Sequence, residues 1–469
     1  MIFHPENTVL TGGSHLFSKD TRAVAHPCLC KEVIKEFFHG FTFSLSMLNL
    51  DPTNELIFRI GSASPLTTDG FSYAINVTKE GICITAKSEH DLILGFMTLI
   101  DRIKAIDTDD GECVASVDCC QIRDMPLYEM RSVHFCVFPQ TELWELERFV
   151  RFCGALKFSH VILEFWGTLR YDVMKELSWP TAFSKEQIRP IVALANDLGM
   201  EIVPMFNHWG HAPASRDMHG KHVVLDQNPA LQSYFDESGW CWDIRKEKVR
   251  ALLRSVRNEL IELCGSGGYF HIGCDEADHF DPIEESVACL CEFINEISAD
   301  LKARGRRTLL WGDMLLCHEP NHHPENKYTC NATSSESQKY LLEHLDHDLI
   351  VADWQYKATH VPVETALTFR DAGFECLLCP WDRGYSQLYA CSRTVREYGL
   401  KGLLHTTWHT LSSGMHFVMV AALSGFEALA PNPSVHFRPF AASLLRKVCF
   451  VNGDYERAGW SKSEIGDIV

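Results

Sequence analysis

The sequence lacks long apolar runs and has no signal-like segment at its start. No stretch approaches the roughly 20 consecutive apolar residues that a membrane-spanning helix needs. Met1 to Leu10 has neither the basic nor the apolar region of a secretory signal. Together these absences predict a protein that does not cross a membrane, and they lead us to expect a cytoplasmic location.

Positive charge is scarce relative to negative charge. The chain of 469 residues has 43 Lys and Arg against 62 Asp and Glu, a net charge of −19. Binding to phosphates needs the opposite sign. The composition therefore argues against a nucleic acid or an anionic membrane as partner, and leaves neutral or cationic ligands open.

The 19 cysteines lack the paired spacing of a zinc knuckle. Cys28 and Cys30 are separated by one residue, and Cys119 and Cys120 are adjacent, so neither pair has the required two-residue gap. Others, such as Cys376 and Cys379, lie in apolar runs. We expect reduced, buried thiols as in a cytosolic protein, with no metal and no cofactor.

From about Met130 onward, short β-rich apolar runs alternate with longer helix-periodic segments. Eight such repeats predict an α/β fold, a closed (β/α)8 TIM barrel, because an open doubly wound sheet usually stops at about five to seven strands. The strand candidates are Met130–Phe138, His160–Trp166, Glu201–Asn207, Tyr269–Asp275, Thr308–Met314, Leu349–Tyr356, Glu375–Trp381 and Gly402–Trp408.

Helical stretches separate these strands, and several end at a glycine that a C-cap with positive φ favours. The helix candidates include Glu142–Leu156, Lys185–Leu198, Lys246–Cys264 and Glu285–Ala303, and the glycines are Gly199, Gly265, Gly305 and Gly373.

The chain divides into three parts by this pattern. Residues 1–128 form a small α/β domain, in which Phe71–Val77 and Gly81–Ala86 are expected to pair and a helix to run from His90 to about Ile106. Residues 129–430 form the barrel. Residues 431–469 are a short C-terminal extension, which begins where Pro431 and Pro433 break the last barrel helix. The extension and the N-terminal domain are candidate interfaces of a homodimer.

Tryptophans gather where the barrel strands are expected to end. Active sites of such barrels lie at the carboxyl ends of the strands. Indole rings stack on the apolar faces of pyranose rings and can wall a small pocket around a methyl group. The pattern therefore predicts a sugar site, with strand-end tryptophans at Trp166, Trp311, Trp354, Trp381 and Trp408.

Asp275 and Glu276 follow the apolar run that contains His271 and Gly273. Because side chains alternate along a strand, His271, Gly273 and Asp275 are expected to face the barrel interior, and Glu276 to turn into the same pocket. Two carboxylates this close raise the proton affinity of one of them, which suits a general acid. Adjacent residues do not readily flank a glycosidic bond, so the pair fits a substrate that supplies its own nucleophile, with one carboxylate as acid/base and the other orienting an acetamido group.

The segment His271-Ile272-Gly273-Cys274-Asp275-Glu276 resembles the His-x-Gly-x-Asp-Glu signature of glycoside hydrolase family 20, a family that uses substrate-assisted catalysis. The N-terminal domain is similar to the module that precedes the barrel of that family, and the chain most resembles the intracellular hexosaminidase D-like branch. The resemblance implies a retaining exo-β-N-acetylhexosaminidase that removes terminal β-linked GlcNAc or GalNAc from glycans or glycoconjugates.

The resemblance also implies roles for single residues. Glu276 is expected to be the acid/base, Asp275 to hold the acetamido nitrogen and Tyr356 to donate to the acetamido oxygen. The other expected substrate-site residues are Trp311, Trp354 and Trp408 around the methyl group, Arg131, Asp313 and Asp382 on ring hydroxyls, Trp381 beside them, and His211 and Glu164 supporting the acid.

The chain departs from the family pattern on the side that would recognise ring hydroxyls. Trp408 is followed by His409 where the family often has Glu, strand two ends Glu164-Phe165-Trp166, and the strand-three loop has no acidic residue. These changes leave the choice between gluco and galacto sugars open.

Two other functions stay open from the sequence. The first is a metal-dependent barrel hydrolase, and the second is a sugar-binding barrel without catalysis. The ligands imagined for the metal are His208, His211, His271, Asp275 and His405.

Overall fold

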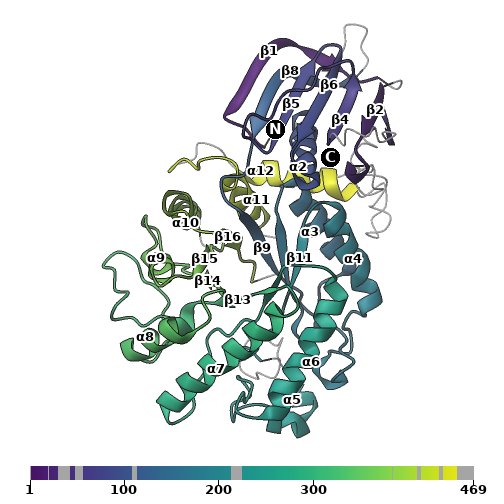
Figure 1. The fold of residues 1–469 in the computed structure, drawn as a ribbon. Coiled ribbons are helices and arrows are strands. Elements are labelled where there is room, and N and C mark those ends of the chain that lie inside the picture. The colour runs from purple at the N-terminus through teal and green to yellow at the C-terminus, as the bar shows by residue number, and fades with distance from the viewer. Residues whose placement is uncertain are drawn as a thin grey trace.

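The structure is a computed structural model that describes residues 2–18, 21–29, 43–47, 56–107, 113–212, 224–382, 384–408, 414–431 and 437–450. A twisted sheet domain stands on one end of a closed barrel (Figure 1). None of the described helices is long and apolar enough to cross a membrane.

Eight parallel strands close into the barrel in the order β10-β11-β12-β13-β14-β15-β16-β9, which confirms the predicted fold class. Apolar side chains such as Met130, Ile162 and Leu309 fill its interior, and Trp311 lies among them. The strands are β9 Met130–Cys136, β10 His160–Glu164, β11 Glu201–Met205, β12 Tyr269–His271, β13 Arg307–Trp311, β14 Ile350–Asp353, β15 Glu375–Leu378 and β16 Gly402–His405.

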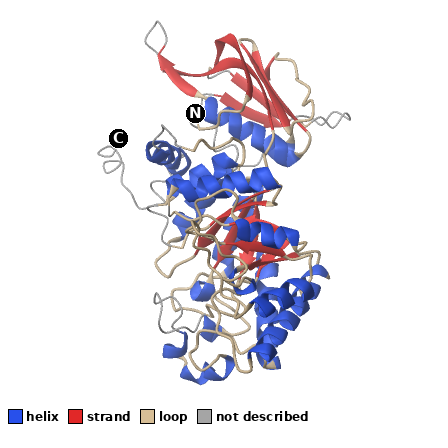
Figure 2. Ribbon diagram, turned by 90° about the vertical axis from the view of Figure 1, so that its left-hand side faces the viewer, coloured by secondary structure: helices blue, strands red, loops and turns tan. Residues whose placement is uncertain are grey.

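Helices surround the strands, as Figure 2 shows in blue around the red barrel. The predicted glycines Gly199, Gly265, Gly305 and Gly373 all have positive φ, as expected. The helices are α3 Leu143–Ala155, α4 Lys185–Asp197, α5 Val224–Gln227, α6 Glu247–Cys264, α7 Ile283–Lys302, α8 Ser335–His344, α9 Glu364–Asp371, α10 Tyr385–Tyr398, α11 Met415–Ser424 and α12 Phe437–Phe450.

The barrel strands begin within one residue of their predicted starts but end two to four residues earlier than predicted. After the last ladder pairs the backbone turns sharply, for example into 3-10 helices at Trp166–Thr168 and Asp313–Leu315. The predicted strand ends are therefore the loops at the barrel mouth. Their hydrophobic residues pack around the mouth, which explains why the apolar pattern continues past the strands.

The N-terminal sheet has the strand order β1-β8-β5-β6-β4-β2-β3, with β7 paired to β8. The predicted hairpin is confirmed, since β5 and β6 pair antiparallel. Its elements are β1 Asn7–Leu16, β2 Thr21–Ala25, β3 Phe43–Met47, β4 Ile57–Gly61, β5 Tyr73–Thr78, β6 Gly81–Ala86, α2 Glu89–Arg102, β7 Lys104–Asp107 and β8 Cys113–Asp124.

Helix α2 lies between the sheet and the barrel (Figure 1). It ends earlier than the predicted Ile106, because Ile103 is extended and the next residues form β7. The ring of His90 bonds the carbonyl of Gly199, just before β11, at 2.9 Å. The sheet domain therefore rests on the amino ends of the barrel strands, the end opposite to a site at their carboxyl ends.

The cysteines whose side chains are described are free thiols, and all of them except Cys289 are buried. The prediction of reduced, buried cysteines is confirmed for these residues. Cys30, one of the residues weighed as a zinc ligand, lies outside the described part of the chain.

Lys157 links the two domains from the turn after α3. Its ammonium lies 3.7 Å from the ring centroids of both Phe3 and Phe426 and 3.7 Å from Asp124 Oδ2. Burial, only partly offset by Asp124, lowers the pKa of Lys157 to about 8. Its charge is thus held at the domain junction at some cost in stability.

This cost predicts how the stability of the folded protein responds to pH. Between about pH 8 and pH 10.5 the unfolded lysine keeps a proton that the folded one has lost, so Lys157 makes the free energy of unfolding rise with pH. The rise across that window is about 3 kcal/mol at most. Urea unfolding of the wild type and of Lys157→Met, with reductant, measures it: their difference in unfolding free energy should grow in favour of the wild type as the pH rises. A difference that stays constant from pH 7 to pH 10 would contradict the assignment.

Candidate active site

The acidic pair stands in a strained segment just beyond β12. Gly273, Cys274 and Glu276 have φ values of 67°, 71° and 43°, in the left-handed region. At Gly273 a Cβ would lie 1.7 Å from Asn207 Oδ1, so only glycine fits. The strand predicted to reach Asp275 ends at His271, and the regular alternation expected for this segment is therefore wrong. Strained residues of this kind gather at functional sites.

Despite the broken alternation, both carboxyl groups reach the mouth of the barrel beside His211. The Nε2 atom of His211 lies 3.0 Å from Glu276 Oε2 and 3.4 Å from Asp275 Oδ2. The Asp275 side chain is 8% exposed, whereas that of Glu276 is 43% exposed. One carboxyl group is thus buried, and the other is exposed to solvent.

Burial sets the protonation of this cluster. Desolvation raises the pKa of Asp275 to about 8; the charges of Asp313, Glu276 and Glu164 raise it as well, and His211 lowers it. Burial lowers the pKa of His211, but the charges of Asp275, Glu276 and Glu164 outweigh this effect and raise it. The raised proton affinity expected for one member of the pair is found at Asp275, the buried carboxyl group, whereas the expected acid/base is Glu276.

Asp275 Oδ1 has no hydrogen-bond partner in the described structure. It is buried, and its partner oxygen Oδ2 faces His211. A buried carboxylate oxygen without a donor costs about 1–3 kcal/mol or more. The atom is therefore available to accept an N–H or O–H from a ligand in the pocket.

Aromatic side chains from four successive strands line the same mouth. Tyr356, after β14, lies between Trp354 and Trp381, with ring centroids 5.1 Å and 5.2 Å away. Trp408, after β16, packs against Trp311 at the end of β13 with a centroid distance of 5.6 Å. Four of the predicted tryptophans and Tyr356 thus form one wall, whereas the ring of Trp166 contacts Phe138.

The Tyr356 hydroxyl is fixed within this wall. Trp408 Nε1 donates to it at 2.5 Å, and Thr406 Oγ1 lies 3.1 Å away. Because an indole can only donate, the hydroxyl accepts from Trp408 and retains its own proton. Burial raises the pKa of Tyr356 well above its ordinary value, which keeps that proton in place.

Asp313 is buried and already engaged with protein donors. Its Oδ2 accepts from the backbone N–H of Glu276 at 2.9 Å and from Asn331 Nδ2 at 2.8 Å, and its Oδ1 accepts from Trp354 Nε1 at 3.0 Å. Asp313 joins Glu276 to the aromatic wall. Its contact with a ring hydroxyl stays a prediction.

Glu164 lies below the pocket, at the end of β10. It accepts from Cys136 Sγ at 3.2 Å and from Asn207 Nδ2 at 2.6 Å, and it pairs with His134 Nε2 at 3.0 Å. Its charge raises the pKa of both His211 and Asp275. Glu164 therefore acts on Asp275 and His211 through its charge from a fully buried position.

The prediction for Arg131 is wrong. This residue opens β9 at the amino end of the barrel, where its guanidinium donates to the carbonyls of Lys157 and Glu129 and contacts the ring of His90. It lies 3% exposed at the junction with the sheet domain. The second residue of a parallel barrel strand lies at the end opposite to the active site, so Arg131 cannot bind the same sugar as Glu276.

Two further predicted residues follow β15 at the mouth. Trp381 and Asp382 are both half-buried, and the Trp381 ring contacts Tyr356. His409, which differs from the family pattern, lies outside the described residues.

Trp240 was missed by the sequence analysis. Its Nε1 donates to the Glu276 carbonyl at 2.6 Å, and its ring centroid lies 4.3 Å from that of His211. It comes from the irregular segment between β11 and α6. The pattern Trp240-Cys241-Trp242 in a segment without helical or strand periodicity is the signal that marks it.

The five residues considered as metal ligands do not form one cluster, although His211 Nε2 lies 3.4 Å from Asp275 Oδ2. Among the residues that the structure describes, the groups with metal-like spacing are His134, Cys136 and Glu164, and Asp236, Cys241 and Asp278. Neither includes any of the five residues considered. In the first group the glutamate already pairs with the histidine and accepts from the cysteine.

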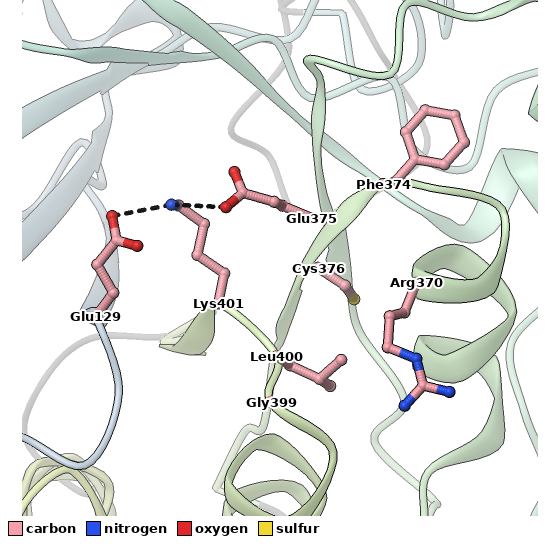
Figure 3. Close-up of a pocket in the computed structure, with 8 residues that line it drawn as sticks. All are labelled: Glu129, Arg370, Phe374, Glu375, Cys376, Gly399, Leu400 and Lys401. Atoms are coloured by element: carbon pink, nitrogen blue, oxygen red, sulfur yellow. Dashed lines mark hydrogen bonds and ion pairs between the residues drawn. The ribbon is translucent and has the colours of Figure 1, made fainter.

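A separate pocket of about 280 Å³ opens at the other end of the barrel (Figure 3). Lys401 lies between Glu129 and Glu375 there, with Nζ–oxygen distances of 2.9 Å and 3.1 Å. These residues precede β9, begin β15 and precede β16, so the pocket lies at the amino ends of the strands. Its ion pairs tie three strands together, far from the acidic pair.

Comparisons with known proteins agree with this geometry. The domain described as "Glycosyl hydrolase family 20, catalytic domain" matches residues 159–385. A β-hexosaminidase of Porphyromonas gingivalis is 23% identical over 304 residues, which cover 56% of this chain and 38% of that protein. Hexosaminidase D of Bos taurus is 23% identical over 176 residues, which cover 34% of this chain and 48% of that protein. The chain thus spans less than half the length of these two relatives.

Solved structures share the whole architecture. The family 20 exo-β-N-acetylglucosaminidase of Vibrio harveyi, solved with N-acetylglucosamine, has a TM-score of 0.70 at 15% identity and covers 97% of this chain and 78% of that one. At this identity the likeness establishes the fold alone. The matched catalytic domain contains the Asp275-Glu276 pair and most of the barrel. Residues 159–385 therefore match the catalytic domain of glycoside hydrolase family 20.

Proposed function

We propose that this protein is a retaining exo-β-N-acetylhexosaminidase that removes terminal β-linked GlcNAc or GalNAc with the substrate's own acetamido group as nucleophile. The unpartnered Asp275 Oδ1 carries this proposal, because it is a buried acceptor placed beside the exposed carboxyl group of Glu276. An acetamido N–H is a donor that would satisfy it. The names of the relatives, a β-hexosaminidase and hexosaminidase D, support the same activity.

In the first step the acetamido carbonyl oxygen attacks C1 as the bond from C1 to the leaving oxygen breaks. Glu276 transfers its proton to that oxygen, so the alcohol leaves neutral. Asp275 accepts the acetamido N–H and stabilises the positive charge that develops on the oxazolinium ring. The Tyr356 hydroxyl donates to the acetamido oxygen and holds it on the reacting side of the sugar.

In the second step water attacks C1 and opens the ring. Glu276, now ionised, removes a proton from the water, and the acetamido group is restored. Two displacements at C1 return the β configuration. Adjacent carboxylates suffice for this scheme, because neither has to attack the sugar.

The acetamido group is proposed to bind against the aromatic wall, which is formed by Trp311, Trp354, Tyr356, Trp381 and Trp408. Its rings exclude water and present apolar surface to the methyl group. The indole N–H of Trp311 has no acceptor among the described residues, which leaves a further donor in this wall.

The cluster of Asp275, Glu276 and His211 gives the activity a pH dependence. Catalysis needs ionised Asp275, so kcat/KM should fall as the pH drops below about 8, far above the ordinary carboxyl range. His211 lowers the pKa of Asp275, so its loss should raise that pKa further and move the acidic limb upward by about one pH unit or more.

The variant His211→Asn tests this with a substrate whose leaving group needs no proton. The kcat/KM of His211→Asn should approach that of the wild type only at a higher pH. His279→Asn is the matched control, because this histidine lies on the loop after β12 and its ring packs on Trp209. An acidic limb unchanged in His211→Asn would refute the coupling.

The assay that tests the proposed function compares p-nitrophenyl N-acetyl-β-glucosaminide with its galacto epimer. Cleavage of either supports the enzyme, and the ratio of the two kcat/KM values gives the sugar preference. If neither is cleaved while N-acetylglucosamine binds, the protein is a sugar-binding barrel without catalysis. Activity that vanishes with a chelator and returns with zinc would favour the metal-dependent alternative.

We further propose a cytoplasmic location, supported by the free thiols of the described residues. Fractionation of cells that produce the full chain tests it. The homodimer stays a prediction, and sedimentation of the purified protein would decide it.

A further inference from the structure

Glu276 has a backbone conformation that is unfavourable for a residue other than glycine. Its φ of 43° lies in the left-handed region, which costs a non-glycine residue free energy. Relaxation to an ordinary conformation would swing its carboxyl group away from His211 and Asp275. Something must therefore hold this residue in place.

Two side chains from different loops hold its backbone. The N–H of Glu276 donates to Asp313 Oδ2 at 2.9 Å, and its carbonyl accepts from Trp240 Nε1 at 2.6 Å. Both polar backbone groups of the acid are thus bonded to side chains, one from the loop after β13 and one from the segment before α6.

Both anchors are themselves rigid. Asp313 is 1% exposed and is fixed by Asn331 and Trp354. The carbonyl of Trp240 accepts from the N–H of Ala212 at 3.0 Å, and its N–H donates to Ser238 Oγ at 3.0 Å.

The turn that bears Trp240 is also closed on itself. The N–H of Asp236 donates to the carbonyl of Cys241 at 2.9 Å, and the N–H of Cys241 donates to Asp236 Oδ1 at 3.2 Å. The indole N–H therefore reaches Glu276 from a fixed point rather than from a loose loop.

We propose that Trp240 and Asp313 are positioning residues that clamp the backbone of Glu276 and so aim its carboxyl group at the leaving oxygen. The proposal rests on the proposed function only for its kinetic consequence. The ring of Trp240 also packs against the ring of His211, whose Nε2 lies 3.0 Å from Glu276 Oε2. The Trp240 side chain therefore contacts both His211 and Glu276.

Trp240→Phe removes the indole N–H and keeps an aromatic ring on His211. If the clamp aims the acid, kcat should fall about tenfold for leaving groups that need a proton, since one hydrogen bond contributes about 1 kcal/mol. It should change little for a dinitrophenyl leaving group, and KM should stay the same. Rates should therefore depend more steeply on the leaving-group pKa than in the wild type.

Trp242→Phe is the matched control, because its Nε1 donates to the carbonyl of Asn207 at 2.9 Å and not to Glu276. It removes an indole N–H from the same segment, and should affect all leaving groups equally. Asp313→Ala removes both acceptor oxygens. It loses the bonds from Glu276, Asn331 and Trp354, and should show a larger loss than Trp240→Phe.

Hydrogen exchange of the peptide around residue 276 gives a readout that does not depend on activity. The clamp predicts faster exchange there in Asp313→Ala and Trp240→Phe than in Trp242→Phe. Faster exchange in a protein that cleaves no hexosaminide would keep the clamp and refute the proposed function. Unchanged exchange, or equal rate losses for all leaving groups in an active enzyme, would overturn the clamp.

Discussion

Glu276→Gln should lower kcat about 10²–10⁴-fold for a substrate with a sugar or alkyl leaving group, because the amide has no proton to give the departing oxygen. For a dinitrophenyl glycoside the first step should be nearly as fast as in the wild type, since that leaving group departs as a stable anion. The second step still needs a base, so the intermediate should accumulate and a burst should precede slow turnover.

Stopped-flow release of the aryl group measures both phases. Asp278→Asn is the matched control, as an exposed carboxyl group two residues further along the same loop. A variant that loses the same factor for every leaving group, without a burst, would show that Glu276 does not transfer the proton.

Asp275→Asn should lower kcat about 10²–10³-fold, the loss expected when one preorganised group that stabilises developing charge is removed. The KM should change little, because the ground-state sugar carries no charge for Asp275 to stabilise. The variant should also lose the acidic limb set by the raised pKa of Asp275.

Binding of a thiazoline analogue, a stable mimic of the cyclic intermediate, provides the second readout. Its affinity should fall in Asp275→Asn by a factor close to the loss in kcat, while the affinity for N-acetylglucosamine should be nearly unchanged. A variant in which KM rises and kcat stays the same would mean that Asp275 only binds the sugar.

The barrel was predictable because its strands are buried on both faces and read as apolar runs of regular spacing. Their starts were accurate, since a glycine or polar turn precedes most of them, as at Gly199 before β11. Their ends were not, because residues such as Trp166 and Met314 continue the apolar pattern into 3-10 helices at the mouth.

The residues of the candidate site also differ in how well the sequence predicts them. The pair Asp275 and Glu276 was found because a signature marks it, and the strand-end aromatics because several point to one end of the barrel. Arg131 was assigned by resemblance against the geometry of the chain, which already placed it at the beginning of a strand. The strand direction was the better guide.

Two features depend on contacts that no local pattern encodes. A sequence does not reveal whether Asp313 offers its carboxylate to a ligand or, as here, to Glu276 and Trp354. The place of Trp240 depends on a turn closed by Asp236 and Cys241, in a segment without regular periodicity.

The proposed mechanism depends on attack of the substrate's acetamido oxygen on C1. Four aryl glycosides that carry the same leaving group and an N-acetyl group bearing zero, one, two or three fluorines test this step. Each fluorine withdraws electrons from the carbonyl oxygen and weakens it as a nucleophile, so kcat/KM should fall steeply and steadily along the series. A series in which kcat/KM stays level would contradict the account and would require a nucleophile from the protein or from water.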